Sequence, residues 1–327
     1  MRKLTKFYEL LLAGIVTAVV YGLLARYLFG KTNQIASLTF FFVVPALLGY
    51  LPLLFVSKEL LQKRWVVFVS PAVTILVFCI VMFLLGIENV LCLLILLAPF
   101  LLLSVIGAWV GSVVYRRIRL NRERKQQDLL VLAIIPFLVA PLEALIKSPT
   151  QTWGMESWVV IDALPQTVWK NIVAVPTIKQ HEYKAGFFNR LGVPRPLRAS
   201  VDLWAKGGHR TGEFDGGLTI REVITEYNEN KKISFAITID TATVGNDVFQ
   251  QHVLKGAYFS FVDAAYSLQP LSGGRTKLVL SSGYRLTSKF NFYGRWWGDK
   301  ILSDFQSRLL EVIKNRCEGE SQRTVLY

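Results

Sequence analysis

Long apolar stretches fill the first 146 residues of this 327-residue chain and are absent from the rest. A helix that crosses a bilayer core needs about 20 consecutive apolar residues, because each residue rises about 1.5 Å and every backbone group must be hydrogen-bonded internally. Five stretches approach or meet this length: 7–29, 35–56, 65–87, 90–115 and 129–146. The sequence therefore predicts a transmembrane anchor over residues 1–147, followed by a water-soluble domain.

The first and last of these stretches each have a competing interpretation. The run at 7–29 follows three basic residues, as in a signal peptide, but it is too long, lacks a clear small-residue cleavage site and precedes further spans. We therefore expect it to be a retained helix. The stretch at 129–146 is shorter and contains two prolines and Glu143, so it is either a fifth span or an interfacial or re-entrant segment.

Lysine and arginine lie mostly on one side of the predicted spans, and basic loops stay in the cytoplasm. With the N-terminus inside, two basic residues, Arg26 and Lys31, fall on the outer side. The twelve on the cytoplasmic side are Arg2, Lys3, Lys6, Lys58, Lys63, Arg64, Arg116, Arg117, Arg119, Arg122, Arg124 and Lys125. We predict a multi-pass protein of the bacterial inner membrane with a cytoplasmic N-terminus and a periplasmic C-terminal domain. If 129–146 does not cross, that domain is cytoplasmic.

Much of the formal net charge of +14 belongs to this topological signal. A nucleic-acid-binding domain needs a concentrated basic face, whereas the dense basic run at 116–125 lies between two predicted spans, beside anionic lipid headgroups. We therefore expect membrane lipids, and no nucleic acid, as partners. Only Glu143 resembles the intramembrane ionisable group of an ion path, which favours an anchor over a transporter. Gly107 and Gly111 have the spacing that lets two helices approach closely.

The C-terminal part has the pattern of an α+β domain. A short β-rich run at 157–163 precedes a helix at 165–173 that begins with proline. Strand-like runs separated by glycine- and asparagine-rich turns follow at 197–205, 218–227, 232–240, 257–268 and 277–287. From 296 to 317, apolar residues recur at three- and four-residue steps, which predicts a long amphipathic helix. This order predicts a helix-grip arrangement, in which a curved antiparallel sheet wraps round the C-terminal helix.

Three segments of the C-terminal part carry a family resemblance. They are WVVIDALPQTVWKNI at 158–172, GEFDGGLTIREVITEYNENKKISFAI at 212–237, and SSGYRLTSKFNFYGRWWGDKILSDFQSRLLEVIKNR at 281–316. Together they resemble START-related, polyketide cyclase/dehydrase-type (SRPBCC) domains, in the bacterial membrane-anchored branch. The resemblance covers residues 155–318 and leaves 319–327 as a tail. It implies a cavity between sheet and closing helix that takes lipids, sterols, polyketides or aromatic ligands, with few catalytic residues shared among members.

Recognisable catalytic and cofactor motifs are absent from the sequence. The three histidines, His181, His209 and His252, are far apart and lack the spacing of metal ligands. The chain contains no nucleophile elbow, phosphate-binding loop or dinucleotide fingerprint. We therefore expect no metal and no cofactor, and assign no catalytic residue.

Polar and aromatic side chains on the strands and at the start of the closing helix are the cavity candidates: Arg221, Glu222, Tyr258, Tyr266, Tyr284, Arg285, Tyr293 and Trp297. Tyrosine combines an apolar ring with a hydroxyl that orients a ligand, and ordinary core packing is the alternative role. Strand residues alternate between faces, which puts Glu222 and Glu226 on one face and Arg221 and Tyr227 on the other. Both faces mix polar and apolar residues, so the alternation leaves open which of them lines the cavity. If Glu222 points inward, we expect it, with a basic partner such as Arg285, to stabilise the sheet rather than to bind a headgroup.

A further group of apolar side chains suits contact with a bilayer. Phe187, Phe188 and Leu191 lie in a loop rich in arginine, which predicts a lid or a membrane-touching loop. Tryptophans near the ends of the domain are also candidates for interfacial anchors: Trp153, Trp158, Trp296 and Trp297.

These patterns favour a membrane-tethered, START-like module that binds a lipid or other hydrophobic small molecule at the membrane surface. One alternative is a cyclase- or dehydratase-like enzyme in which Glu222, Tyr284 or Arg285 polarises a carbonyl. Another is a protein-interaction domain whose pocket is filled by side chains.

Overall fold

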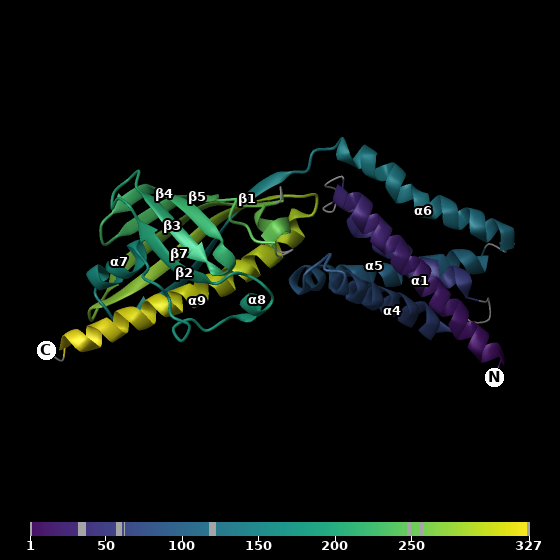
Figure 1. Cartoon of the computed structure of the whole chain (residues 1–327), viewed down its shortest axis with the longest axis horizontal. Coiled ribbons are helices and arrows are strands. Elements are labelled where there is room, and N and C mark those ends of the chain that lie inside the picture. Colours follow the sequence, from purple (N-terminus) through teal and green to yellow (C-terminus); the bar gives the residue numbers. More distant parts are fainter. Residues whose placement is uncertain are drawn as a thin grey trace. The chain divides into compact units, whose positions relative to one another are not determined.

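A computed structural model of the chain describes residues 2–31, 37–56, 61, 63–117, 122–246, 250–255 and 258–325. The chain divides into two compact units, which we describe separately (Figure 1). The N-terminal unit comprises Met1–Ser148 together with Ser288–Phe290, and the C-terminal unit comprises Pro149–Thr287 and Asn291–Tyr327. Lys58 and Arg119, and the ends 35–36, 257 and 326–327 of three predicted ranges, lie outside the described residues.

The described part of the N-terminal unit is helical. Its elements are α1 (Arg2–Lys31), η1 (Thr39–Val43), α2 (Val44–Tyr50), η2 (Leu51–Phe55), α4 (Arg64–Leu84), α5 (Val90–Arg117) and α6 (Arg122–Ala144). Among the described residues, three helices are long and apolar enough to cross a membrane, over Tyr8–Lys31, Arg64–Leu84 and Val90–Val114. The apolar helices Thr39–Phe55 and Ala133–Ala144 are shorter.

The second predicted span is an irregular helix. It begins with the π-helical turn η1, continues as α2 and ends with the 3-10 turn η2. Pro45 and Pro52 stand at the start of α2 and η2. Because proline lacks a backbone N–H and collides with the preceding turn, it disfavours one uninterrupted α-helix here.

Close helix approach in the N-terminal unit depends on glycine. A Cβ atom on Gly107 of α5 would lie 2.1 Å from the backbone oxygen of Ala46 in α2, and one on Gly49 would lie 1.9 Å from the backbone oxygen of Ser104. A Cβ on Gly111 would collide with the ring of Tyr50 at 2.0 Å. The Gly107 and Gly111 pair therefore lets α5 lie directly against α2, as its spacing predicts.

Among the described residues of the N-terminal unit, one ion pair is buried and another is partly buried. The guanidinium of Arg26 in α1 lies 2.6 Å from the Glu88 carboxylate, and both side chains are less than a tenth exposed. Glu143, near the end of α6, accepts hydrogen bonds from the backbone N–H groups of Leu38 and Thr39 at 2.6 and 2.9 Å. Its carboxylate also lies 3.1 Å from Nζ of Lys289. Glu143 thus satisfies the open N–H groups at the start of the helix that begins at Thr39.

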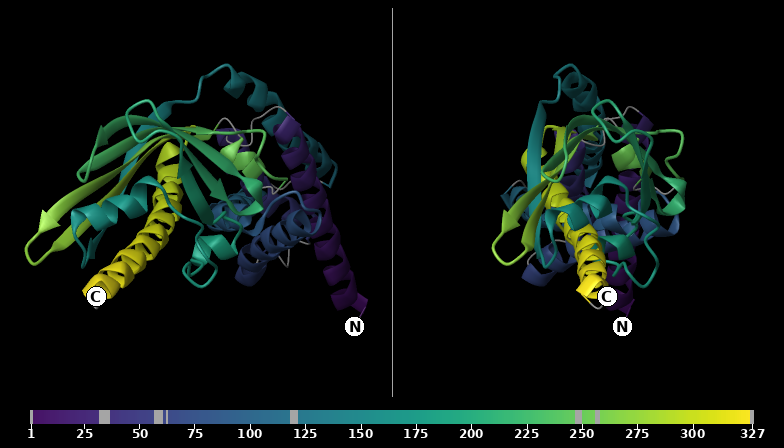
Figure 2. Two further views of the ribbon diagram at one scale, coloured as in Figure 1. Left: turned by 60° about the vertical axis from the view of Figure 1, so that its left-hand side comes forward. Right: turned by 90° about the vertical axis from the view of Figure 1, so that its left-hand side faces the viewer.

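The described part of the C-terminal unit contains one seven-stranded antiparallel sheet in the order β1-β7-β6-β5-β4-β3-β2. Its strands are β1 (Thr150–Ile161), β2 (Pro196–Val201), β3 (His209–Phe214), β4 (Thr219–Asn228), β5 (Lys232–Ile239), β6 (Phe259–Leu271) and β7 (Arg275–Thr287). The helical elements are α7 (Pro165–Val173), α8 (Phe187–Arg190), η3 (Asp215–Gly217), η4 (Gln250–Leu254) and α9 (Asn291–Val325). The sheet curves over α9 (Figure 2), which is consistent with a helix-grip fold.

One large core joins α7 and α9 to the sheet. Val168, Trp169 and Ile172 of α7 and Leu309, Val312 and Ile313 of α9 are buried against strand residues that include Phe235 and Leu278. We call the face of the sheet that these helices cover the inner face, and the opposite one the outer face. Burying the apolar stripe of α9 contributes roughly 25 cal/mol per Å² removed from water.

Three elements of the C-terminal unit differ most from the sequence-based expectation. β1 begins at Thr150 rather than 157, α9 extends from Asn291 to Val325 rather than from 296 to 317, and β3 has no predicted counterpart. Gly294 and Gly298 lie in the first turns of α9, and glycine weakens a helical pattern. Residues 319–325 of the predicted tail belong to this helix.

Candidate functional site

The strand register determines which side chains share the inner face. Arg210 of β3 pairs with Glu222 of β4, and Glu222 pairs with Ile237 of β5. Directly opposed residues on neighbouring antiparallel strands point to the same face. A bulge between Ile224 and Glu226 then reverses the alternation in β4. Tyr227 consequently turns inward, against Trp169 at 5.4 Å between ring centroids, which corrects the predicted pairing of its face with that of Arg221.

Arg210 and Glu222 form a buried ion pair on this face. Arg210 donates through Nη1 to Oε2 of Glu222 and through Nε to the backbone oxygen of Val173 at 3.2 Å. Its guanidinium lies 5.0 Å from the centre of the Phe235 ring. The two side chains are only 7% and 11% exposed. Burial alone would lower the pKa of Arg210, but the adjacent Glu222 carboxylate raises it overall, so the guanidinium stays charged.

Tyr266 lies beside the same ion pair and is itself buried. Burial is the main cause that raises the pKa of its hydroxyl to about 12, with Arg210 acting in the opposite direction. The contacts of Arg210 with a carboxylate, a carbonyl and a ring identify it as a residue that links β3, β4 and the end of α7. The prediction that Glu222 stabilises the sheet fits this geometry, but its partner is Arg210 and not Arg285.

The arginines predicted to line the cavity do not lie on the inner face. Arg285 is exposed on β7. Arg221 is exposed as well, and its guanidinium contacts Asp240 at 2.6 Å. Both residues alternate with inward ones, namely Glu222 and Tyr284, so they point outward. Of the three alternatives for polarising a carbonyl, Glu222 and Tyr284 therefore lie on the inner face and Arg285 does not.

Tyr284 links β7 to the first turns of α9. Its side chain is fully buried, and its hydroxyl donates to Oδ1 of Asp299 at 2.6 Å. The ring stacks on Phe259 with centroids 5.8 Å apart, and Trp153 lies 6.2 Å away. Burial is the largest cause that raises the pKa of Tyr284, and the hydrogen bond to Asp299 adds to it. Gly298 allows this contact, because a Cβ there would lie 3.2 Å from the tyrosine ring.

The inner face near the start of α9 is apolar and only partly covered. Trp153, Met155, Phe259 and Phe261 pack round Tyr284, Leu286 and Leu302, but these four remain partly exposed. Apolar side chains further across the sheet are also partly exposed, namely Phe214, Ile237 and Ile239, and so is Phe305 on α9. Phe214 and Phe305 approach to 6.1 Å between centroids. By contrast, the core at the other end of the sheet is closed over Ile233, Leu278 and Ile313.

One buried polar side chain lies between these two regions. Gln306 of α9 is completely buried, and its Nε2 donates to Oγ of Ser282 at 2.9 Å. Its Oε1 has no hydrogen-bond partner among the described residues. A buried acceptor without a donor costs about 1–3 kcal/mol, so Gln306 is a position where a donor from a bound molecule or a water would be stabilising.

The other predicted positions are dispersed. Tyr258 precedes β6 and is partly exposed, whereas Tyr293 and Trp297 lie half-buried on the first turns of α9. In the predicted lid, Phe187 is 59% exposed, and Phe188 is buried. Leu191 follows α8 and is partly exposed. Phe187 is therefore the most exposed of the three side chains of the predicted lid.

Arg210, Gln306, Phe259 and Phe261 were not among the sequence-based candidates. Arg210 lies in β3, whose sequence HRTGEF lacks the apolar alternation of a strand. Its charge complementarity to Glu222 twelve residues later was the available signal. Gln306 has a weaker signal: it is a polar residue within the apolar stripe of the closing helix.

The outer face carries a separate hollow of about 420 Å³. It lies over the cross-strand pair Gly154 and Gly283, with the exposed carboxylates of Glu156 and Asp263 at its rim. A Cβ on Gly283 would lie 2.6 Å from the Asp263 carboxylate. The hollow is open and acidic, so it does not suit an apolar ligand.

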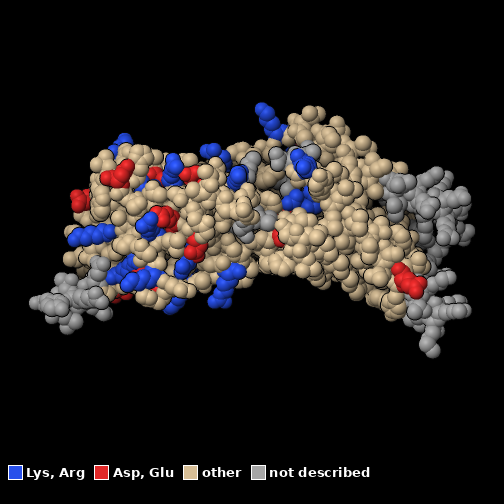
Figure 3. All heavy atoms as spheres, in the orientation of Figure 1, with Lys and Arg blue, Asp and Glu red and all other residues tan. Residues whose placement is uncertain are grey.

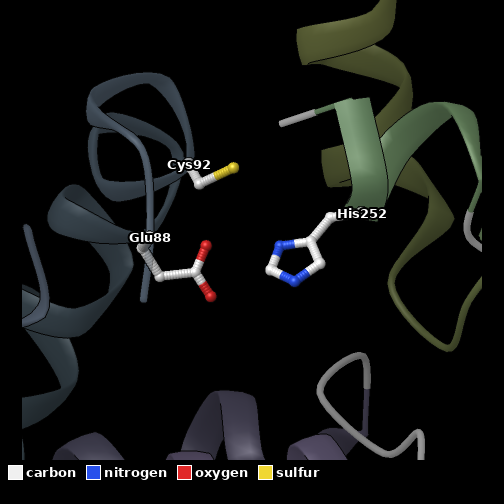
Figure 4. A group of neighbouring side chains, drawn as sticks. All are labelled: Glu88, Cys92 and His252. Carbon is white, nitrogen blue, oxygen red and sulfur yellow. The ribbon is translucent and has the colours of Figure 1, made fainter. Parts of the chain in front are cut away.

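Charged side chains of both signs are interspersed over the C-terminal unit in the face drawn in Figure 3. Figure 4 shows Glu88, Cys92 and His252, three residues of the types that bind metals. Glu88 and Cys92 belong to the N-terminal unit and His252 to the C-terminal unit, and Glu88 is already paired with Arg26. We assign no metal site to them.

Comparisons with known proteins do not assign the chain to a family. No protein-family model and no curated protein matches it. Similar solved structures include an aromatase/cyclase from Streptomyces, 14% identical over 54% of this chain and 96% of that one, with a TM-score of 0.32. A truncated norcoclaurine synthase from Thalictrum flavum is 10% identical over 52% and 95%, with a TM-score of 0.34. An uncharacterised protein from Rhizobium leguminosarum is 12% identical over 52% and 99%, with a TM-score of 0.33. These values are too low to assign a family or a function.

Proposed function

We propose that the chain is a membrane-tethered module whose C-terminal unit binds a lipid or another hydrophobic small molecule between the inner face of its sheet and α9. The observation that carries this proposal is the partly exposed apolar surface formed by Trp153, Phe259, Phe261, Ile237 and Phe305. Ligand sites are mostly apolar, with a few polar groups that fix orientation. Here the buried amide of Gln306 is one such group.

The apolar helices of the N-terminal unit support the membrane attachment. Their outward side chains include Leu12, Leu84, Leu102 and Leu138, each more than 60% exposed. Apolar area of this extent is a liability in water and is favourable in a bilayer. As part of the proposal, the unit anchors the chain in a bacterial inner membrane with the C-terminal unit on the periplasmic side.

The test compares ligand retention in two variants of adjacent residues on β5. Ile237 faces inward opposite Glu222, and Thr238 faces outward opposite Arg221. Ile237→Trp fills the proposed site, whereas Thr238→Trp adds the same indole to the outer face. Each full-length protein is purified in one detergent, extracted with organic solvent and analysed by mass spectrometry.

We expect the wild type and Thr238→Trp to retain an apolar molecule at about one per chain, and Ile237→Trp to lose it. Lipid held by the membrane helices is common to all three proteins, so it cancels in the comparison. Equal retention in wild type and Ile237→Trp, with both folded by thermal unfolding, would exclude a ligand at this site.

A further inference from the structure

Two large apolar side chains are exposed on the first turns of α9. Phe292 is 74% exposed and Trp296 is 53% exposed. Residues four positions apart lie on the same side of a helix, so the two rings form one apolar surface. The side chains next to them in the sequence are less exposed: Asn291 is buried and Trp297 is half-buried.

Other side chains hold this surface in place. Trp296 packs edge-to-face on Trp297, with ring centroids 4.9 Å apart. Arg295 precedes Trp296 in the chain, and its guanidinium lies 3.4 Å from Asp299 and 5.7 Å from the centre of the Trp153 ring. A tryptophan beside an arginine at the edge of an apolar surface is the combination found at the headgroup level of membranes.

The chain on either side connects this surface to the apolar N-terminal unit. Ser288–Phe290 belong to that unit, where Phe290 stacks on Phe41 at 4.3 Å and Lys289 pairs with Glu143. Phe292 follows Phe290 by two residues, so their Cα atoms are at most about 7 Å apart. A bilayer that surrounds the N-terminal unit at Phe290 would therefore also reach Phe292.

We propose that Phe292 and Trp296 form a contact surface for the headgroup region of a phospholipid bilayer. The surface keeps the start of α9, where Tyr284 and Asp299 meet, at the membrane. An apolar molecule that leaves the bilayer would then enter the partly covered inner face directly. This inference rests on the membrane attachment proposed above and not on the presence of a bound ligand.

The test uses tryptophan quenching by lipids that carry bromine on the upper part of the acyl chain. Full-length wild type, Trp296→Phe and Trp204→Phe are reconstituted in vesicles of brominated and of plain phosphatidylglycerol and phosphatidylcholine. Trp204 is the matched control. It is 47% exposed and lies between β2 and β3, at the end of the sheet opposite the start of α9. Subtracting each variant from the wild type isolates one of the eight tryptophans.

We expect the emission assigned to Trp296 to be lost in brominated vesicles and the emission assigned to Trp204 to be the same in both kinds of vesicle. If Trp296 is unquenched while the rest of the protein is quenched, the protein is in the bilayer and the proposed contact surface is wrong. If no tryptophan is quenched, the membrane attachment itself is wrong, and this inference fails with it.

Discussion

Arg210 and Glu222 each depend on the other, because both charges lie inside the C-terminal unit. Removing one partner leaves a buried charge without compensation, which costs about 3–5 kcal/mol, whereas replacing both with apolar residues is often nearly neutral. We therefore expect Arg210→Met to lower the unfolding temperature of the full-length protein strongly. The double variant Arg210→Met, Glu222→Leu should recover most of the loss. Thermal unfolding in detergent, followed by near-ultraviolet circular dichroism, measures both.

An additive result, with the double variant less stable than either single one, would show that the pair does not act as a unit.

The same pair shows the limit of sequence reasoning at the residue scale. The alternation of β4 groups Glu222 with Ile220 and Ile224, but it does not say which face points inward. Arg210 was missed because its partner is determined by the register of β3 on β4, and no local pattern encodes that register.

Among the elements, α9 is fastened near its C-terminal end by Arg316. This guanidinium contacts the Glu182 carboxylate at 2.8 Å and donates to the backbone oxygens of Pro176 and Thr177. The hydrogen bond from Arg316 is the main cause that lowers the pKa of Glu182 from 4.5 to about 2. The stabilisation is complete above pH 4.5 and is lost as the pH falls towards 2.

We expect the difference in unfolding temperature between wild type and Glu182→Gln to be constant from pH 7 to about 5 and to shrink between about pH 4.5 and 2. Unfolding scans of both proteins across this range measure it. The control is Glu311→Gln, since Glu311 is more exposed and its pair with Lys184 has a distance of 3.4 Å. A difference that does not change with pH would mean that Glu182 titrates normally.

Helix packing in the N-terminal unit gives a second prediction at this scale. In Gly107→Ala, the new Cβ meets the backbone oxygen of Ala46, which no side-chain rotation can relieve. We expect a loss of about 1–3 kcal/mol or more, as for other overpacked cores. In Gly319→Ala, the new Cβ on α9 meets nothing within 4 Å, so alanine should be neutral or stabilise by up to about 1 kcal/mol. Unfolding midpoints in detergent distinguish the two, and equal stabilities would contradict the close contact of α2 and α5.

Elements with a strong internal period could be predicted, and those defined by their neighbours could not. The helix Pro165–Val173 has the predicted bounds, and the centre of α9 follows its apolar period. β3 depends on pairing with β2 and β4 rather than on its own apolar content. The inner apolar surface was foreseen only as a list of aromatic residues, because the bulges in β4 and β6 decide which of them point inward.

At the scale of the whole molecule, two short elements decide on which side of the membrane the proposed anchor would hold the C-terminal unit. From residue 129 to its end at Ala144, the apolar part of α6 extends about 24 Å, somewhat less than a bilayer core of about 30 Å. The helical segment Thr39–Phe55 is of similar length. A bilayer accommodates such short segments by local thinning at modest cost. The partners of Glu143 also satisfy the charge at the end of α6.

We therefore expect both short elements to cross, and fusions to alkaline phosphatase and to a fluorescent protein test each one separately. A fusion after Arg117 should be fluorescent and lack phosphatase activity, because an even number of crossings precedes it. Fusions after Ile146 and after Tyr327 should show phosphatase activity and no fluorescence. If all three fusions are fluorescent, α6 does not cross and the C-terminal unit would take its proposed ligand on the cytoplasmic side. If the fusion after Arg117 has phosphatase activity, an odd number of crossings precedes it, and the short segment Thr39–Phe55 is the one that fails to cross. The basic residues that follow α5 would then lie outside, against the rule that keeps them in the cytoplasm.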